Sequence, residues 1–179
     1  MDKLVQIMHL LITFASSIYI TIVVVRFILQ WVRADFYNPL SQFIVKATNP
    51  LLLPLRKVVP GFLGIDFASL VLAWLLQIAT IGLLSIISGH GIPPLWAVLV
   101  YSIRELLLLV LNIYLLSFIV LVIISWIAPH NHNPAISLIV SITEPVLAPI
   151  RRIIPPMGGL DFSIMIALLI IYILKILLI

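Results

Sequence analysis

Two pairs of neighbouring basic residues carry the side chains best suited to bind an anion. The pairs are Arg56-Lys57 and Arg151-Arg152, and prolines frame both at matching distances. Guanidinium and ammonium groups bind phosphate oxygens through charge-assisted hydrogen bonds. The pairs are therefore candidate contacts for anionic lipid headgroups, phosphate or a partner protein. The simpler interpretation is that they anchor the chain at the cytoplasmic face of a membrane, where basic residues gather.

An aspartate follows the first arginine of each pair after ten residues, at Asp66 and Asp161. Both aspartates stand directly before a long apolar run, which is the N-cap position of a helix. A carboxylate there accepts hydrogen bonds from free backbone amides and is favoured by the helix dipole. We predict that both are helix caps. Pairing with Arg56 and Arg151, or binding of a cation, is the alternative, and a cap can also neighbour an arginine.

No residue pattern predicts catalysis or a bound cofactor. The chain has no cysteine, and it contains no nucleophile–base pair, metal-ligand spacing or phosphate-binding loop. Haem or metal binding would have to use histidines, which are His9, His90, His130 and His132. The His130-x-His132 pair has no counterpart in the other half of the chain. Only His9 could lie in the membrane, and haem ligation by two histidines needs a second histidine there. We predict a protein that is not an enzyme and has no metal or cofactor.

These residues belong to one stretch that occurs twice. Residues 38–67 and 133–162, here called the first copy and the second copy, align without a gap at an offset of 95. Such a pattern indicates an internal duplication. The framing prolines fall at matching positions in the two copies: Pro50, Pro54 and Pro60 in the first, Pro145, Pro149 and Pro155 in the second.

The composition places both copies in a membrane protein. Of the 179 residues, 64% are hydrophobic and 9% are charged, against roughly 45–50% and 25% in an ordinary soluble domain. Four apolar runs have the length of a membrane-spanning helix, about 17–25 residues or more: residues 4–32, 67–88, 106–127 and 162–179. The net charge of +4 is too scattered to predict nucleic-acid binding and is better explained by orientation in a bilayer.

Each copy links two spans and carries its own helix signals. Asn38-Pro39 is typical of a helix start, with asparagine as the cap and proline at the first position. Apolar residues then recur at helical spacing, which predicts an amphipathic helix that ends at Pro50. Pro54 would begin a second short helix lying in the membrane interface. The second copy repeats this plan, and whether the two loops re-enter the membrane or lie flat is left open.

The predicted fold is an all-α membrane protein with four transmembrane helices, arranged as two parallel repeats with a Pro-rich interfacial helical loop in each. Residues 1–94 form repeat 1 with loop 33–66, and residues 95–179 form repeat 2 with loop 128–161. Six basic residues lie on the side of the loops and three on the other side. The loops are therefore expected in the cytoplasm and both termini outside. The remaining base, Arg26, lies close enough to the inner interface to snorkel.

The motif P-x₃-P-[LI]-R-[KR]-x₂-P, present in both copies, resembles that of the YggT family of small bacterial membrane proteins, in its two-repeat enterobacterial form. The resemblance extends over nearly the whole chain, although Pro156 replaces Gly61 in the second copy. It implies a multi-pass inner-membrane protein with no catalytic residues. Family members are linked to osmotic-shock tolerance and potassium homeostasis, one chloroplast relative to assembly of a b-type cytochrome, and others to envelope and division organisation.

Two functions follow as expectations. The first, implied by the resemblance, is a role in osmotic stress and ion homeostasis, with any permeation path at the pseudo-axis or between protomers. A coupled pump is disfavoured because all six acidic residues lie outside the spans. The alternative is a scaffold or assembly factor for membrane proteins or for envelope and division organisation. Expected partners are the bilayer with its anionic lipids and a second copy or another membrane protein, and no nucleic acid.

Overall fold

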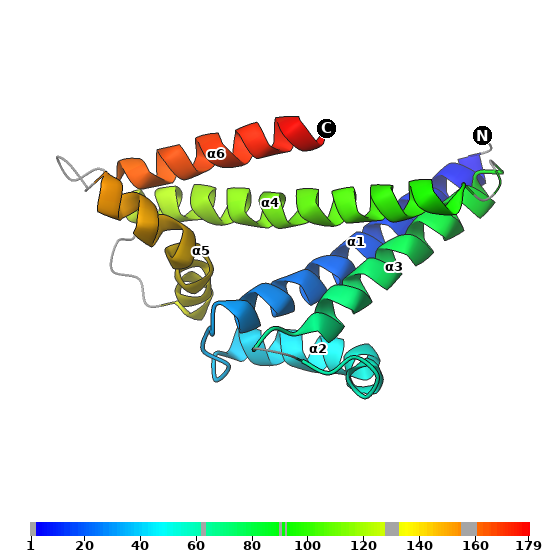
Figure 1. Ribbon diagram of the computed structural model, residues 1–179, viewed down its shortest axis with the longest axis horizontal. Helices are drawn as coiled ribbons and strands as arrows, with labels where there is room; N and C mark the ends of the chain where they lie inside the picture. The colour runs from blue at the N-terminus through cyan, green and yellow to red at the C-terminus, as the bar shows by residue number, and fades with distance from the viewer. Residues whose placement is uncertain (1–2, 62–63, 90, 92, 128–132, 155–160) are drawn as a thin grey trace. The chain divides into compact units, whose positions relative to one another are not determined.

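The computed structural model describes residues 3–61, 64–89, 91, 93–127, 133–154 and 161–179. They form six α-helices and, within these ranges, no β-strand, which confirms the all-α class (Figure 1). The helices are α1 (Lys3–Trp31), α2 (Pro39–Arg56), α3 (Phe67–Ile87), α4 (Leu95–Ile127), α5 (Pro134–Ile153) and α6 (Phe162–Leu178).

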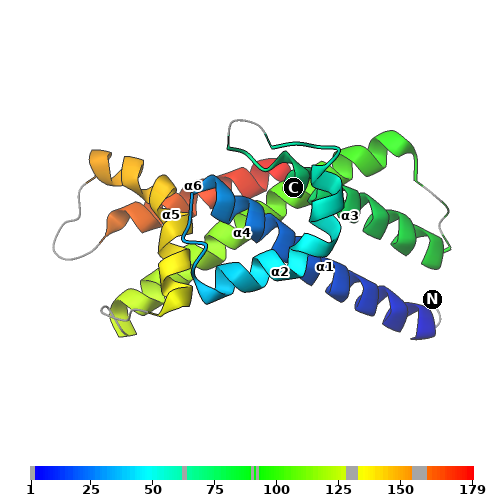
Figure 2. The same ribbon diagram turned by 90° about the horizontal axis from the view of Figure 1, so that it is seen from below.

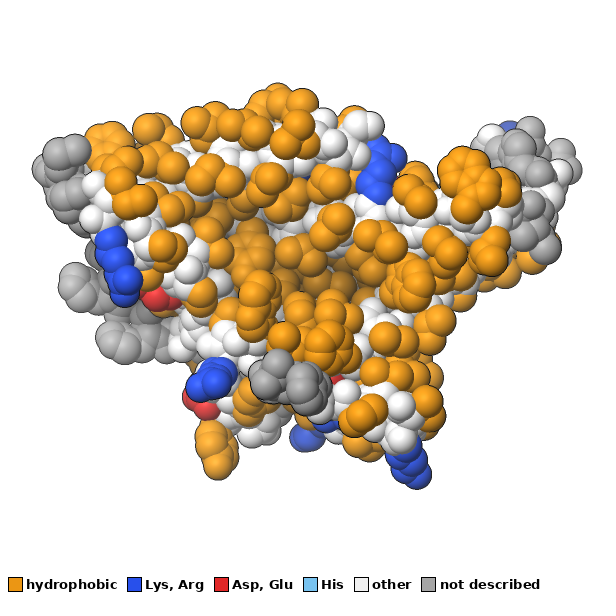
Figure 3. All heavy atoms as spheres, viewed as in Figure 1, with side chains coloured by type: hydrophobic (Ala, Val, Ile, Leu, Met, Phe, Trp, Pro, Cys, Tyr) orange, Lys and Arg blue, Asp and Glu red, His pale blue; other side chains and the backbone are white. Residues whose placement is uncertain are grey.

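Four of the described helices, α1, α3, α4 and α5, are long and apolar enough to cross a membrane. The fourth predicted span forms α6, whose 17 residues are at the short end of the range for a spanning helix. Helix α5, predicted to be interfacial, reaches 20 residues. Helix α4 begins eleven residues before the third predicted span and has 33 residues. Apolar side chains cover most of the face in Figure 3, as expected for a multi-pass membrane protein.

The prediction that Pro50 ends the first loop helix was wrong. Helix α2 continues through Pro50 and Pro54 to Arg56, and α5 likewise continues through Pro145 and Pro149. A proline removes one backbone hydrogen bond and its ring pushes away the carbonyl four residues earlier, which bends a helix without necessarily ending it. Figures 1 and 2 show both helices changing direction along their length. Each loop therefore holds one bent helix rather than two short ones.

The chain forms two compact units. Unit 1 contains Met1–Phe27 and Ile44–Leu109, and unit 2 contains Ile28–Phe43 and Val110–Ile179. In unit 1, α1 and α3 run side by side (Figures 1 and 2) around a small cavity lined by residues of both helices. The Trp74 indole N–H donates to the Ser102 hydroxyl at 2.8 Å, which joins α3 to the first turns of α4.

The core of unit 2 comes from the other end of α4 together with α5 and α6. Phe118 and Leu147 are completely buried, and Ala167 and Ile171 pack with them. Lys175 of α6 donates to the side-chain carbonyl of Asn112 on α4 at 2.7 Å. The division into repeats at residue 94, and the parallel relation between them, stay predictions.

Candidate functional site

The first ion-pair site, formed by Arg56, Asp66 and Ser69, joins the end of α2 to the start of α3. Arg56 Nη2 lies 2.5 Å from Asp66 Oδ2. The same carboxylate oxygen accepts the Ser69 hydroxyl at 2.6 Å, and Oδ1 accepts the Ser69 backbone amide at 3.4 Å. Gly64, at φ +80°, supplies a left-handed turn shortly before the cap, a conformation that glycine adopts without steric cost. Asp66 thus caps α3 and binds the arginine at the same time.

Burial and hydrogen bonding act in opposite directions on Asp66. The residue is 2% exposed, and the loss of water alone would raise the pKa of its carboxyl. The hydrogen bonds from Arg56 and Ser69 together outweigh that effect, so the pKa lies below its ordinary value. The carboxylate is therefore charged at neutral pH, and the arginine is its counter-ion.

The second ion-pair site, formed by Glu144, Arg151 and Asp161, repeats this arrangement with an additional acid. Arg151 Nε donates to Asp161 Oδ2 at 2.8 Å, and Asp161 caps α6 by accepting the Ser163 amide at 3.0 Å. Arg151 Nη1 also donates to both carboxylate oxygens of Glu144, at 2.8 and 3.1 Å. Burial alone would raise the pKa of Asp161, but the bonds from Arg151 and Ser163 outweigh that effect and leave the pKa below its ordinary value.

The structure divides each predicted basic pair into two roles. Arg56 and Arg151 point back to an aspartate within the same copy, whereas Lys57 and Arg152 are exposed. Arg56 and Arg151 thus hold the bend of the chain. Lys57 and Arg152 are the more accessible members of the two pairs for contact with a lipid surface or a partner protein. Of the framing prolines, Pro155 lies outside the described residues, as do His90, His130 and His132.

Arg26 has a role that the sequence analysis missed. It is 4% exposed and, instead of reaching toward solvent, donates through Nη1 to the Thr48 hydroxyl, to the Val45 carbonyl at 3.1 Å and to Asn49 Oδ1 at 2.9 Å. These acceptors lie in the turn of α2 just before Pro50. The only available signal was a mismatch between the copies: the residue 95 positions after Arg26 is Leu121.

The two loop helices also touch where they begin. Asn38 Oδ1 accepts the Leu40 amide at 2.9 Å, as Asn133 Oδ1 accepts the Ala135 amide, so each asparagine caps its helix. Asn38 Nδ2 donates to the Pro134 carbonyl at 2.8 Å. Pro134 follows Asn133 as Pro39 follows Asn38. The starts of α2 and α5 therefore lie in direct contact, and both belong to unit 2.

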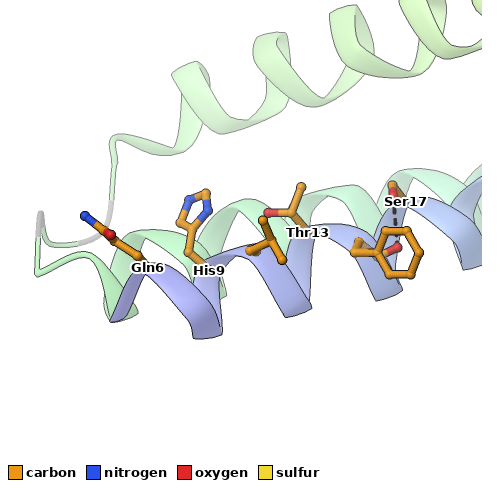
Figure 4. Close-up of a pocket in the computed structure, with 6 residues that line it drawn as sticks. Gln6, His9, Thr13 and Ser17 are labelled. Carbon is orange, nitrogen blue, oxygen red and sulfur yellow. Dashed lines mark hydrogen bonds between the residues drawn. The ribbon is translucent and has the colours of Figure 1, made fainter. Parts of the chain in front are cut away.

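Polar side chains within the spans form hydrogen bonds either to another helix or to their own helix. Tyr19 of α1 links two helices by donating to the Ala47 carbonyl of α2 at 3.3 Å. Ser17, Thr80 and Ser117 instead bond to carbonyls of their own helix. On α1, Gln6, His9, Thr13 and Ser17 follow one face (Figure 4) and, with Leu10 and Phe14, line an open cavity of about 540 Å³.

Comparison with known proteins places the chain in a family. The family model CCB3/YggT matches residues 5–87 and 100–179. An uncharacterized protein of Pseudomonas aeruginosa, PA0392, is 50% identical over 149 residues, which cover 83% of this chain and 76% of that protein. The uncharacterized protein YggT of Escherichia coli K12 is 39% identical over 163 residues, covering 89% and 82%.

A third relative, an uncharacterized protein encoded in the proC 3' region of Vibrio alginolyticus, is 37% identical over 160 residues, covering 89% of this chain and 86% of its own length. No solved structure matches the chain. The family model matches both halves, and the relatives are 37–50% identical over most of their length, so the chain belongs to the CCB3/YggT family.

Proposed function

We propose that this chain is a non-enzymatic protein of the bacterial inner membrane that serves as a scaffold, holding other membrane components against two basic cytoplasmic loops. The observation that carries this proposal is the repeated ion-pair site. In each copy an arginine fixes the bent loop helix to the cap of the next helix, and the neighbouring base is exposed.

The arrangement of the ion-pair sites and their neighbouring bases suits the binding of a partner better than catalysis. A docking surface needs charged groups held in place by a rigid support, because ordering a flexible loop on binding reduces affinity. The Arg56–Asp66 and Arg151–Asp161 bonds supply that support next to Lys57 and Arg152. Basic groups at the cytoplasmic face attract anionic lipids by about 1 kcal/mol each. They would also attract acidic segments of a partner protein.

The test is crosslinking in intact cells with a charge-matched control. The Lys57→Ala/Arg152→Ala variant removes the two exposed bases, and Arg33→Ala/Lys46→Ala removes two other exposed bases on the side of the loops. The scaffold proposal expects specific crosslinked products of the wild type to disappear in the first variant and to persist in the control. Products unchanged in the first variant, or lost equally in both, would contradict it.

A role in osmotic stress and ion homeostasis is the second candidate, and the polar face of α1 favours it. Gln6, His9, Thr13 and Ser17 follow that face (Figure 4). Polar groups in a membrane helix usually face a cavity or another helix. Purified protein in liposomes would then show potassium flux that decreases when Thr13→Val and Ser17→Ala remove the hydroxyls. Flux no greater than through empty vesicles would exclude this role.

A further inference from the structure

A cavity of about 610 Å³ opens beside the second ion-pair site, among the end of α4, α5 and the start of α6. Its volume lies in the range of ligand pockets, about 300–1,000 Å³. The charged lining consists of Glu144, Arg151 and Asp161, and Arg151 holds the two acids together by bonding to both. Much of the remaining lining is apolar, including Leu121, Trp126, Leu147, Met165 and Leu168. A charged cluster next to an apolar wall fits an amphiphile.

The charges at this cluster do not balance. Two carboxylates share one guanidinium, so the second ion-pair site has a net charge of −1, and the side chain of Glu144 is 49% exposed. An exposed carboxylate attracts a cation with N–H donors, while Arg151 can face an anion. A zwitterionic headgroup that contains an ammonium group and a phosphate satisfies both.

The first copy shows how the chain itself can supply such a cation. Arg26 lies 95 residues before Leu121, and Asn49 lies 95 residues before Glu144. The guanidinium of Arg26, which precedes the first copy, bonds to Asn49 within it. Both residues differ at the equivalent positions 95 residues on: Leu121, which lines the cavity, replaces the internal cation, and Glu144 replaces the neutral amide.

From this juxtaposition we infer that the cavity binds an aminophospholipid of the bilayer, with its ammonium group on Glu144, its phosphate toward Arg151 and its acyl chains on the apolar wall that includes Leu121. The lipid ammonium would bond to Glu144 as the guanidinium of Arg26 bonds to Asn49, the equivalent residue. This inference concerns a ligand of unit 2 and goes beyond the scaffold proposal, because it does not involve Lys57 or Arg152.

The experiment measures the lipid retained by purified full-length protein after reconstitution into nanodiscs of phosphatidylethanolamine and phosphatidylglycerol in equal amounts. Native mass spectrometry of the released protein gives the ratio of the two lipids. Glu144→Asn reproduces the residue of the first copy, and Leu121→Arg reproduces its internal cation. Glu105→Gln removes an acid outside the cavity and is the control.

The wild type and the control should retain phosphatidylethanolamine preferentially, and Glu144→Asn should reduce the preference about tenfold, the effect of one hydrogen bond to a charged group. Leu121→Arg should abolish it. If that variant does not insert, Leu121→Phe, which fills the cavity without a charge, should reduce total bound lipid. Equal retention of both lipids by the wild type, or an unchanged ratio in Glu144→Asn, would overturn the inference. So would complete displacement of the lipid by dissolved ethanolamine, since the site would then bind only the amine.

Discussion

At the scale of single residues, the two ion-pair sites share their contacts but differ in burial. Asp66 is 2% exposed, whereas the Asp161 side chain is 25% exposed. An isolated charge in a buried position is costly, because little water remains to solvate it. The two arginines should therefore contribute unequally to stability, although their sequence positions are equivalent.

Replacement of Arg56 by alanine should lower the free energy of unfolding by about 3 kcal/mol, because it leaves the buried Asp66 carboxylate without its cation. Arg151→Ala should cost about 1 kcal/mol, because water and Ser163 still solvate Asp161. Unfolding of the purified variants in mixed micelles of increasing SDS content would measure the difference. Lys57→Ala is the control and should leave stability unchanged. Equal losses for the two arginines would show that burial of the aspartate does not decide their contribution.

The lowered pKa of Asp66 also predicts how stability depends on pH. The carboxyl loses its proton more readily in the folded chain, so its contribution is complete above the ordinary aspartate pKa of 3.8. It disappears as the pH falls through the lower folded value. Micellar unfolding between pH 7 and about pH 2 should therefore show a loss of stability below about pH 4. Asp66→Asn should be less stable at pH 7 and should lose less on acidification. A pH profile identical to that of the wild type would contradict this assignment.

At the scale of the helix, prolines set the direction of the loop helices, and neighbouring side chains stabilise the bends. Thr48 and Thr143 are buried, and both hydroxyls bond to the carbonyl four residues earlier, a contact that itself bends helices. In α2, Arg26 adds a donor to the Val45 carbonyl just before the bend. The bend brings the end of the helix to the cap of the next one.

Pro50→Ala should straighten α2, since alanine restores the missing amide and removes the ring. Spin labels at positions 46 and 57 should then move apart by a few ångström, toward the spacing of a straight helix at about 1.5 Å per residue. Pro39→Ala, at the first helical position, should leave that distance unchanged. Straightening should also separate Arg56 from Asp66. The variant should therefore be less stable than the wild type, although alanine favours a helix more than proline does. An unchanged label distance would mean that Pro50 does not cause the bend.

At the scale of the whole molecule, the predicted pseudo-twofold relation places both copies on the same side of the membrane. The Asn38 side chain contacts the Pro134 carbonyl at the starts of α2 and α5, and the relation between the two repeats stays a prediction. The counts of basic residues favour the cytoplasm for that side.

Single cysteines test this topology without background, because the natural chain has none. Cysteines at positions 46 and 141, equivalent in the two copies, should both be protected from an impermeant maleimide in intact cells and become labelled in inverted vesicles. A cysteine at position 3, expected outside, should behave in the opposite way. Labelling of positions 46 and 141 from opposite faces would exclude parallel repeats.

Features that depend on neighbouring residues could be predicted from the sequence, whereas features that depend on bonds between residues far apart in the sequence could not. Asn-Pro pairs and aspartates before apolar runs act on neighbouring amides, so the starts of α2, α3, α5 and α6 could be located from sequence. The continuation of α2 through Pro50 could not be predicted from sequence. One of the bonds next to the bend joins the Val45 carbonyl to Arg26, which lies nineteen residues earlier in the chain. The pairing of Arg151 with Glu144 spans seven residues of α5 and has no counterpart in the first copy, where Asn49 stands at the position of Glu144. Each aspartate has an aspartate at sequence offset 95, whereas Arg26 and Glu144 have no residue of their own kind there. The bonds of Arg26 to Asn49 and of Glu144 to Arg151 were therefore not predicted.

Helix α4 is longer than a bilayer is thick. Its 33 residues extend about 50 Å, against a hydrocarbon core of about 30 Å, and tilt alone, which rarely exceeds about 40°, does not absorb the excess. Its N-terminal part, where the Arg104 guanidinium lies 5.9 Å from the Tyr101 ring centroid, carries the aromatic and charged side chains that suit the headgroup region. The helix consequently couples the protein to membrane thickness: a bilayer with shorter acyl chains would increase its inclination or expose another turn, and one with longer chains would draw it upright.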